Sequence, residues 1–164
     1  MLFGYGAKGM TLSMIEAAID LTGGAIGARE IHEIVELGKA VLAQPVELLP
    51  GIRAAVEAVA VDHRIVLITK GDLFHRIEIV SEKDAGSYAR VIDECGAVAS
   101  KFVMVGNSLR SDIEPVIGLG RWGIHMPYHV TWVHEMQHGV DRGHPRVITV
   151  DAPDAIPEAL ARCR

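Results

Sequence analysis

The stretch that decides the fold is Lys101–Asp112, KFVMVGNSLRSD, in which four apolar residues run directly into a glycine, an asparagine and a serine. An uninterrupted apolar run predicts a strand buried on both faces, as in the parallel sheets of α/β proteins. Gly106 then allows a sharp turn where a side chain would clash. We therefore expect Asn107, Ser108 and Asp112 at the carboxyl end of a buried strand, where open α/β sheets bind their ligands.

The composition indicates an ordinary soluble domain. The 164 residues suit one domain, or one domain with a small appendage, and 49% of them are hydrophobic, so a core can form. A net charge of −5 argues against nucleic acid or an anionic membrane as the main partner. Cys95 and Cys163 lie far apart in the sequence and predict reduced thiols. With neither a signal-peptide pattern nor a membrane-length apolar stretch, we expect a cytoplasmic protein.

The chain divides into a helical front end and an α/β remainder. Helical patterns run from Thr11 to Gly23 and over Ala28–Ala43 with no strand between them, which predicts a small helical cap over residues 1–48. From residue 49 to 164, apolar strand patterns alternate with helical ones. Such alternation predicts a mostly parallel, three-layer Rossmann-like sheet.

One connection does not fit an ordinary parallel sheet. Between a predicted strand at Arg64–Thr69 and a short apolar segment at Ile77–Val80, only the seven residues Lys70–Arg76 remain. A parallel crossover needs about a dozen residues or more. We therefore expect that Ile77–Val80 is not a parallel neighbour of Arg64–Thr69. It would form an antiparallel excursion, lie outside the sheet, or follow a missing crossover helix.

Polar residues follow these strands in an order that suits phosphate chemistry. Thr69 ends one strand, Lys83 lies shortly after a second apolar segment, and Asp112 follows the third. A hydroxyl can hold a phosphate oxygen, an ammonium group neutralises phosphate charge, and carboxylate and amide oxygens suit Mg²⁺. Together they form part of a phosphoryl-transfer site, where charge neutralisation and positioning supply most of the catalysis.

This ordered combination resembles the haloacid dehalogenase-like (HAD) hydrolase superfamily, whose members are mostly Mg²⁺-dependent phosphatases. Val66–Thr69 resembles the second motif of that family, Lys83 matches the lysine of the third motif, and Gly106–Asp112 resembles the fourth motif, usually GDSxxxD. The similarity covers roughly Leu49–Val150. Thr11–Gln44 would be the helical cap that these enzymes insert after their first strand.

The resemblance implies a role for each matching residue. Thr69 and Lys83 would be catalytic residues that bind the transferring phosphoryl group, with Lys70 and Ser108 as further phosphate-binding candidates. Asp112 and Asn107 would hold Mg²⁺. The implied reaction is hydrolysis of a small phosphorylated metabolite through a phospho-aspartate, with the cap choosing the substrate.

The sequence also departs from the family pattern. The first motif, Asp-x-Asp after an apolar strand, supplies the nucleophile, and no Asp-x-Asp occurs in these residues. The chain begins where the cap should, so we expect the first strand, central in the family's sheet, to be missing. Asn107 replaces the usual first aspartate of the fourth motif, which should weaken metal binding. We therefore expect little or no phosphatase activity from this polypeptide.

Two other classes of function stay open. His134-Glu135-x-x-His138 matches the zinc-peptidase motif, with His144 at the position of a third ligand, although Asp141 stands where that motif has glycine. The other alternative is a non-catalytic binding or interaction module. A missing central strand would leave sheet edges unpaired, and unpaired edges favour self-association.

Overall fold

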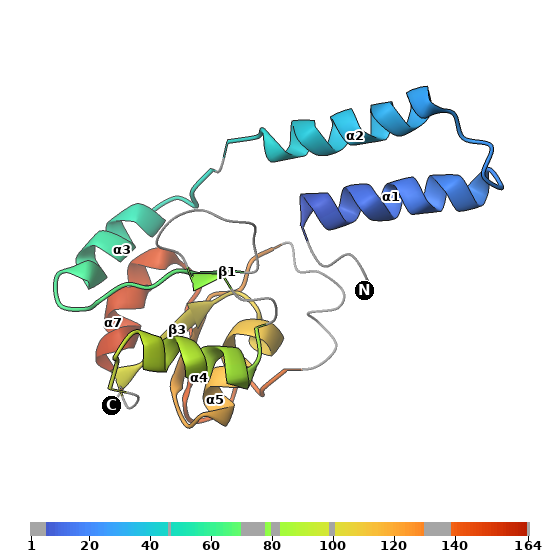
Figure 1. Cartoon of the computed structure of the whole chain (residues 1–164). Helices are drawn as coiled ribbons and strands as arrows, with labels where there is room; N and C mark the ends of the chain where they lie inside the picture. Colours follow the sequence, from blue (N-terminus) through green and yellow to red (C-terminus); the bar gives the residue numbers. More distant parts are fainter. Residues whose placement is uncertain are drawn as a thin grey trace. The chain divides into compact units, whose positions relative to one another are not determined.

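A computed structural model describes residues 6–45, 47–69, 83–98, 101–129 and 139–163, and the backbone of 78–79 (Figure 1). The chain forms two compact units, Met1–Glu47 and Leu48–Arg164. No helix in the described ranges combines the length and the apolar character that a bilayer crossing requires.

The first unit is a helical hairpin of α1 (Ala7–Leu21) and α2 (Ala28–Leu42). The helices cross closely at Gly38, because a Cβ atom there would collide with the side chain of Thr11. Helix α1 begins four residues earlier than the pattern from Thr11 predicted. Helix α2 begins at Ala28 and ends one residue before the expected Ala43.

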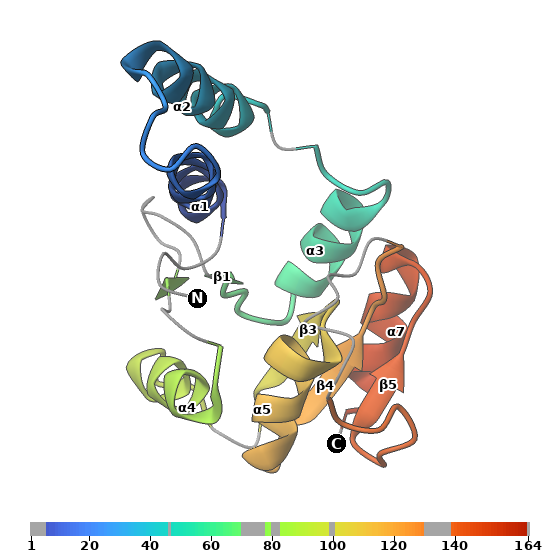
Figure 2. The ribbon, with the colours of Figure 1, turned by 90° about the vertical axis from the view of Figure 1, so that its right-hand side faces the viewer.

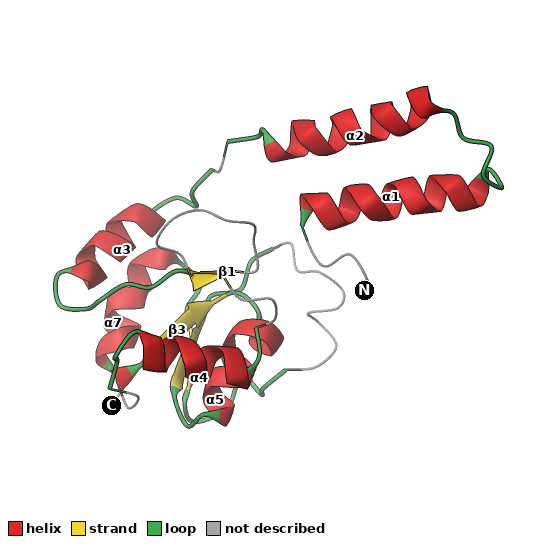
Figure 3. Ribbon diagram, viewed as in Figure 1, coloured by secondary structure: helices red, strands yellow, loops and turns green. Residues whose placement is uncertain are grey.

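The sheet of the second unit is parallel, as predicted. Strand β3 (Val103–Gly106) pairs with β4 (Trp122–His125), which pairs with β5 (Val147–Thr149). The order is therefore β3-β4-β5, with the three strands labelled in Figure 2 and the strands coloured yellow in Figure 3. The register places Gly106 opposite His125, and His125 opposite Thr149. Because the strands are parallel, their carboxyl ends lie at one edge of the sheet.

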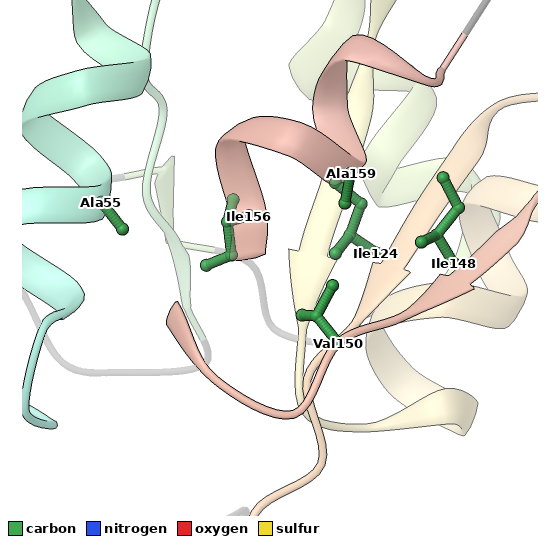
Figure 4. Close-up of a cluster of buried hydrophobic side chains, with 6 residues drawn as sticks. All are labelled: Ala55, Ile124, Ile148, Val150, Ile156 and Ala159. Atoms are coloured by element: carbon green, nitrogen blue, oxygen red, sulfur yellow. The ribbon is translucent and has the colours of Figure 1, made fainter. Parts of the chain in front are cut away.

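Helices cover both faces of this sheet and make three layers (Figure 2). Helices α3 (Ile52–Ala60) and α7 (Ile156–Ala161) pack on one face, with the short 3₁₀ turn η3 (Pro153–Ala155) before α7. The buried side chains of this cluster are Ala55, Ile124, Ile148, Val150, Ile156 and Ala159 (Figure 4). Helices α4 (Ala85–Glu94) and α5 (Glu114–Gly118) pack on the other face around Ile68, Tyr88, Val91, Met104 and Val116. The predicted three-layer α/β fold is confirmed.

The expectation about the short connection was wrong. Strand β1 (Ile68–Thr69) pairs in parallel with β2 (Glu78–Ile79), with Ile68 opposite Glu78. The rule of a dozen residues assumes strands of ordinary length. Here each strand has two residues, so the chain must return only about 7 Å along the strand direction, at about 3.3 Å per residue.

The predicted burial on both faces was also wrong. Met104 is buried, but its neighbour Val105 is 37% exposed, and Leu67 just before β1 is 56% exposed. Within the described chain, no backbone ladder joins β1 to β3, and the five strands form a two-stranded and a three-stranded sheet.

Candidate functional site

The candidate site lies where β3 ends and a tight helical turn begins. The turn η2 (Leu109–Ile113) is π-helical: the Ile113 amide donates to the Ser108 carbonyl oxygen at 3.1 Å, five residues back. The Ser108 side chain caps this turn by accepting from the Ser111 amide at 3.0 Å. Single π turns occur often at functional sites because they reorient one side chain without ending the helix. Asp112 lies within this turn.

Two glycines let this turn lie directly on the sheet. A Cβ atom on Gly106 would lie 2.5 Å from Asp112 Cγ, and one on Gly123 of β4 would lie 2.6 Å from Ile113 Cγ2. Both separations are shorter than real Cβ contacts allow. The backbone at Gly106 is not left-handed, so the glycine is needed for the close approach of Asp112. It places that carboxylate against the end of β3.

Asp112 and Lys83 form a partly buried ion pair. Lys83 Nζ lies 2.6 Å from Asp112 Oδ1, and the Ser108 amide donates to Asp112 Oδ2 at 3.0 Å. Asp112 is 3% exposed, whereas the Lys83 side chain is 17% exposed. Both carboxylate oxygens therefore have a donor, and the lysine reaches the solvent side of the pair. Charge-assisted hydrogen bonds of this kind are short and hold their groups in place.

Helix α4 also contacts the turn η2, through the side chain of Tyr88. The Tyr88 hydroxyl donates to the Ser111 carbonyl oxygen at 3.2 Å, and its ring is fully buried. Burial raises the pKa of the Tyr88 phenol, and the charge of Asp112 adds to the effect. The phenol therefore stays protonated and remains a hydrogen-bond donor.

Sequence reasoning missed one residue of this edge, His125. It ends β4, is 2% exposed, and its Nε2 lies 3.1 Å from the Asn107 carbonyl oxygen. Burial lowers its pKa, as does the charge of Arg142, while the bond to Asn107 and the charge of Asp112 oppose this shift. A single histidine after an apolar strand carries no spacing signal. Only its place at a strand end could have drawn attention to it.

The structure brings some of the predicted residues together and leaves others apart. Lys83, Asp112 and Ser108 are joined by direct contacts, and Asn107 adjoins them with an exposed side chain. Thr69 ends β1, and in the described part of the chain no hydrogen bond links its hydroxyl to Lys83 or Asp112. Its neighbour Ile68 packs in the same cluster as Met104 of β3. Lys70 lies outside the described residues.

The donors at this edge suit Mg²⁺ only modestly. Mg²⁺ in phosphoryl-transfer sites is commonly held by one or two carboxylates, with waters and substrate oxygens completing the shell. Asp112 supplies one carboxylate, and the carboxamide of Asn107 supplies a neutral oxygen. Across the described ranges, no group of three or more His, Cys, Asp or Glu side chains forms a further metal cluster. The residues present fit a weakly held Mg²⁺ that depends on its ligand's own oxygens.

The zinc-peptidase motif falls mostly outside the described residues, which exclude His134, Glu135 and His138. His144 is described, and its Nδ1 accepts a hydrogen bond from the Arg146 amide at 3.2 Å. This contact stabilises the turn before β5 and uses one ring nitrogen of the third candidate ligand.

Two solved structures show what this chain is similar to. A haloacid dehalogenase-like family hydrolase from Xanthomonas campestris is 50% identical, with a TM-score of 0.85, and the alignment covers 98% of this chain and 74% of that one. A 2-haloacid dehalogenase from Pseudomonas syringae pv. tomato is 18% identical, with a TM-score of 0.64, and the alignment covers 95% of this chain and 71% of that one. The second likeness shows the fold alone. No protein-family model matches the sequence, and no curated protein matches it.

Proposed function

The chain belongs to the haloacid dehalogenase-like hydrolase family, and from that premise we propose that its α/β unit binds Mg²⁺ and the phosphoryl group of a small phosphorylated metabolite. The site is the carboxyl edge of β3, at Lys83 and Asp112. We further propose that these 164 residues hydrolyse such esters slowly or not at all, because they contain no Asp-x-Asp nucleophile motif.

The observation that carries this proposal is the contact of 2.6 Å between Lys83 Nζ and Asp112 Oδ1. An ammonium and a carboxylate separated by 29 positions in sequence meet at a strand end, largely removed from water. A phosphoryl group offers Lys83 a new anion, and a metal ion offers Asp112 a new cation. The pair therefore offers a positive charge to the phosphoryl group and a negative charge to the metal ion.

Each site residue has a proposed task. Lys83 would bind and neutralise the phosphoryl oxygens, with Thr69, Lys70 and Ser108 as further phosphate contacts. Asp112 and Asn107 would hold Mg²⁺, which when bound neutralises phosphate charge. The Ser108 amide keeps Asp112 oriented, and Tyr88 keeps the turn in place.

Calorimetry tests the binding half of the proposal. We expect inorganic phosphate to bind in the presence of Mg²⁺ and to lose at least about 10-fold in affinity in Lys83→Met, since a direct charge-assisted contact contributes about 1.5–3 kcal/mol. Asp112→Asn should weaken the binding of Mg²⁺. Lys101→Met, which removes an exposed lysine, is the matched control and should bind like the parent chain. Absence of any phosphate or Mg²⁺ binding in the parent chain would overturn this half.

Turnover of p-nitrophenyl phosphate tests the other half. We expect no Mg²⁺-dependent hydrolysis above background. Turnover that requires Mg²⁺ and disappears in Lys83→Ala would show that the polypeptide has an active nucleophile of its own. A parallel assay with 2-chloropropionate distinguishes a dehalogenase, the activity that the more distant solved structure is named for.

A non-catalytic interaction module is the second candidate, favoured because no ladder joins β1 to β3 among the described residues. Val105 of β3 is 37% exposed and Leu67, just before β1, is 56% exposed. Unpaired strand edges favour pairing with another chain. We propose self-association of this chain through these edges. Light scattering after size exclusion should show a dimer that Val105→Lys converts to a monomer. A parent chain that stays monomeric at about 100 μM, a concentration at which transiently exposed edges already associate, would contradict it.

A further inference from the structure

The ring of His125 lies at the same strand edge as the proposed metal and phosphate site. It is paired in register with Gly106, the residue just before Asn107. The ring is 2% exposed. Burying a polar group costs free energy unless that group forms a hydrogen bond. Its one partner in the described part of the chain is the Asn107 carbonyl oxygen, at 3.1 Å from Nε2.

This contact fixes where the imidazole proton lies. A carbonyl oxygen can only accept, so Nε2 must carry the hydrogen. In the neutral ring, Nδ1 then has a lone pair and no proton. Nδ1 is buried and, among the described residues, makes no hydrogen bond. A proton there would have no described acceptor, so the geometry favours the neutral ring protonated on Nε2.

The Asn107 carbonyl belongs to the same peptide group as the Ser108 amide. On one side of this rigid, planar unit, His125 donates to the carbonyl oxygen. On the other side, the Ser108 amide donates to Asp112 Oδ2 at 3.0 Å, and Asp112 Oδ1 accepts from Lys83. One continuous series of hydrogen bonds therefore runs from the imidazole through a single peptide plane to the carboxylate and the ammonium.

We propose that His125 is a positioning residue: acting through the Asn107–Ser108 peptide group, it holds the Asp112 carboxylate in the orientation that receives Mg²⁺. This rests on the proposed function for the role of Asp112. The hydrogen-bond series itself does not depend on any ligand. Partners behind a metal ligand typically change metal affinity by about 10- to 100-fold when removed.

Two substitutions separate the hydrogen bond from simple packing. His125→Leu keeps a similar volume but removes the donor, so the Asn107 carbonyl loses its partner. His125→Gln keeps an N–H at the distance of Nε2 and should restore it. His63→Leu is the matched control, because His63 also contacts a backbone carbonyl, that of Val59 at 3.3 Å, but is exposed in the turn that follows α3. Urea unfolding establishes that each variant is folded.

The first readout needs no metal. In the parent chain, ¹⁵N shifts of the imidazole should show a protonated Nε2 and a bare Nδ1. Amide exchange at Ser108 should accelerate at least about 10-fold in His125→Leu, because the peptide plane is released, and stay near the parent rate in His125→Gln and His63→Leu. A proton on Nδ1, or unchanged exchange in His125→Leu, would overturn the proposal.

The second readout is Mg²⁺ affinity by calorimetry, expected to fall about 10-fold in His125→Leu and to recover in His125→Gln. Equal affinities in His125→Leu and the parent chain would overturn the proposed positioning. Failure of the parent chain to bind Mg²⁺ would instead count against the proposed function and the metal-receiving role, while Ser108 exchange still decides whether His125 orients Asp112.

Discussion

The two small sheets of the α/β unit differ in the length of their strands and in the burial of their side chains. In the three-stranded sheet, strands of four, four and three residues lie between helices, and Ile124 at its centre is fully buried. In the two-stranded sheet, β1 and β2 have two residues each, and Leu67 beside β1 is mostly exposed. Asp112, Ser108 and His125 depend on the first sheet, whereas Thr69 depends on the second. The firmest part of the candidate site is therefore the part around β3.

Truncating one buried side chain in each sheet should give the largest change in unfolding free energy. Ile124→Ala removes a fully buried side chain and should cost about 3–4 kcal/mol of unfolding free energy, within the usual range for such cavities. Ile68→Ala, in β1, should cost about 2 kcal/mol, at the low end of that range, because its strand has only two residues and Leu67 just before it is mostly exposed. Urea denaturation of both variants measures the difference. Equal losses would show that β1 is as firmly held as β4.

The glycine at the end of β3 gives the next largest effect. Gly106→Ala places a methyl group against the Asp112 carboxylate and should destabilise the fold by about 1–3 kcal/mol through overpacking. Gly118→Ala is the control, because a Cβ there meets nothing within 4 Å. It should be neutral or stabilising in the same urea titration. A harmless Gly106→Ala would mean that Asp112 can move away from β3 at little cost.

A double-mutant cycle measures how strongly Lys83 and Asp112 interact in the folded protein. Lys83→Met, Asp112→Asn and the double variant should show a coupling of about 1–2 kcal/mol, because the pair is largely buried. The pair Lys39–Glu36 on α2 is exposed on both sides and should couple more weakly. Additive effects at Lys83 and Asp112 would show that their contact contributes nothing to stability.

The smallest expected effect is a pH dependence from His125. Burial lowers the pKa of its ring in the folded state below the ordinary value of 6.5. As pH falls through 6.5, the unfolded chain takes up a proton that the folded ring resists, so stability decreases, whereas above 6.5 this contribution is fully present. His125→Gln should reduce this acid loss when unfolding free energies are compared between about pH 5 and pH 8. An identical pH profile would show that the folded ring titrates normally.

Local patterns predicted much of the fold. The strand before Gly106 and the helix over Ala28–Ala43 were both placed within a residue or two, because each is a property of neighbouring residues. The length and pairing of β1 were predicted less well. Strand pairing depends on which segment lies alongside, and the apolar run Ile65–Ile68 fits a strand of any length.

The sequence predicted only part of the candidate site, because contacts between distant segments leave no local pattern. Lys83 and Asp112 were selected from their order along the chain, and the structure joins them across 29 positions. His125 was not selected, because its contact with Asn107 spans 18 positions and follows from the register of β3 on β4. No spacing within one segment encodes that register.

The sequence by itself therefore determined the α/β class, the family resemblance and the polar residues at the end of β3, since these follow from local periodicity and from the order of motifs. The tertiary structure alone decided that β1 pairs in parallel with β2, that Asp112 lies against Gly106, and that the imidazole of His125 holds the Asn107–Ser108 peptide. These three features depend on contacts between segments far apart in the chain, which form only when strands and helices pack.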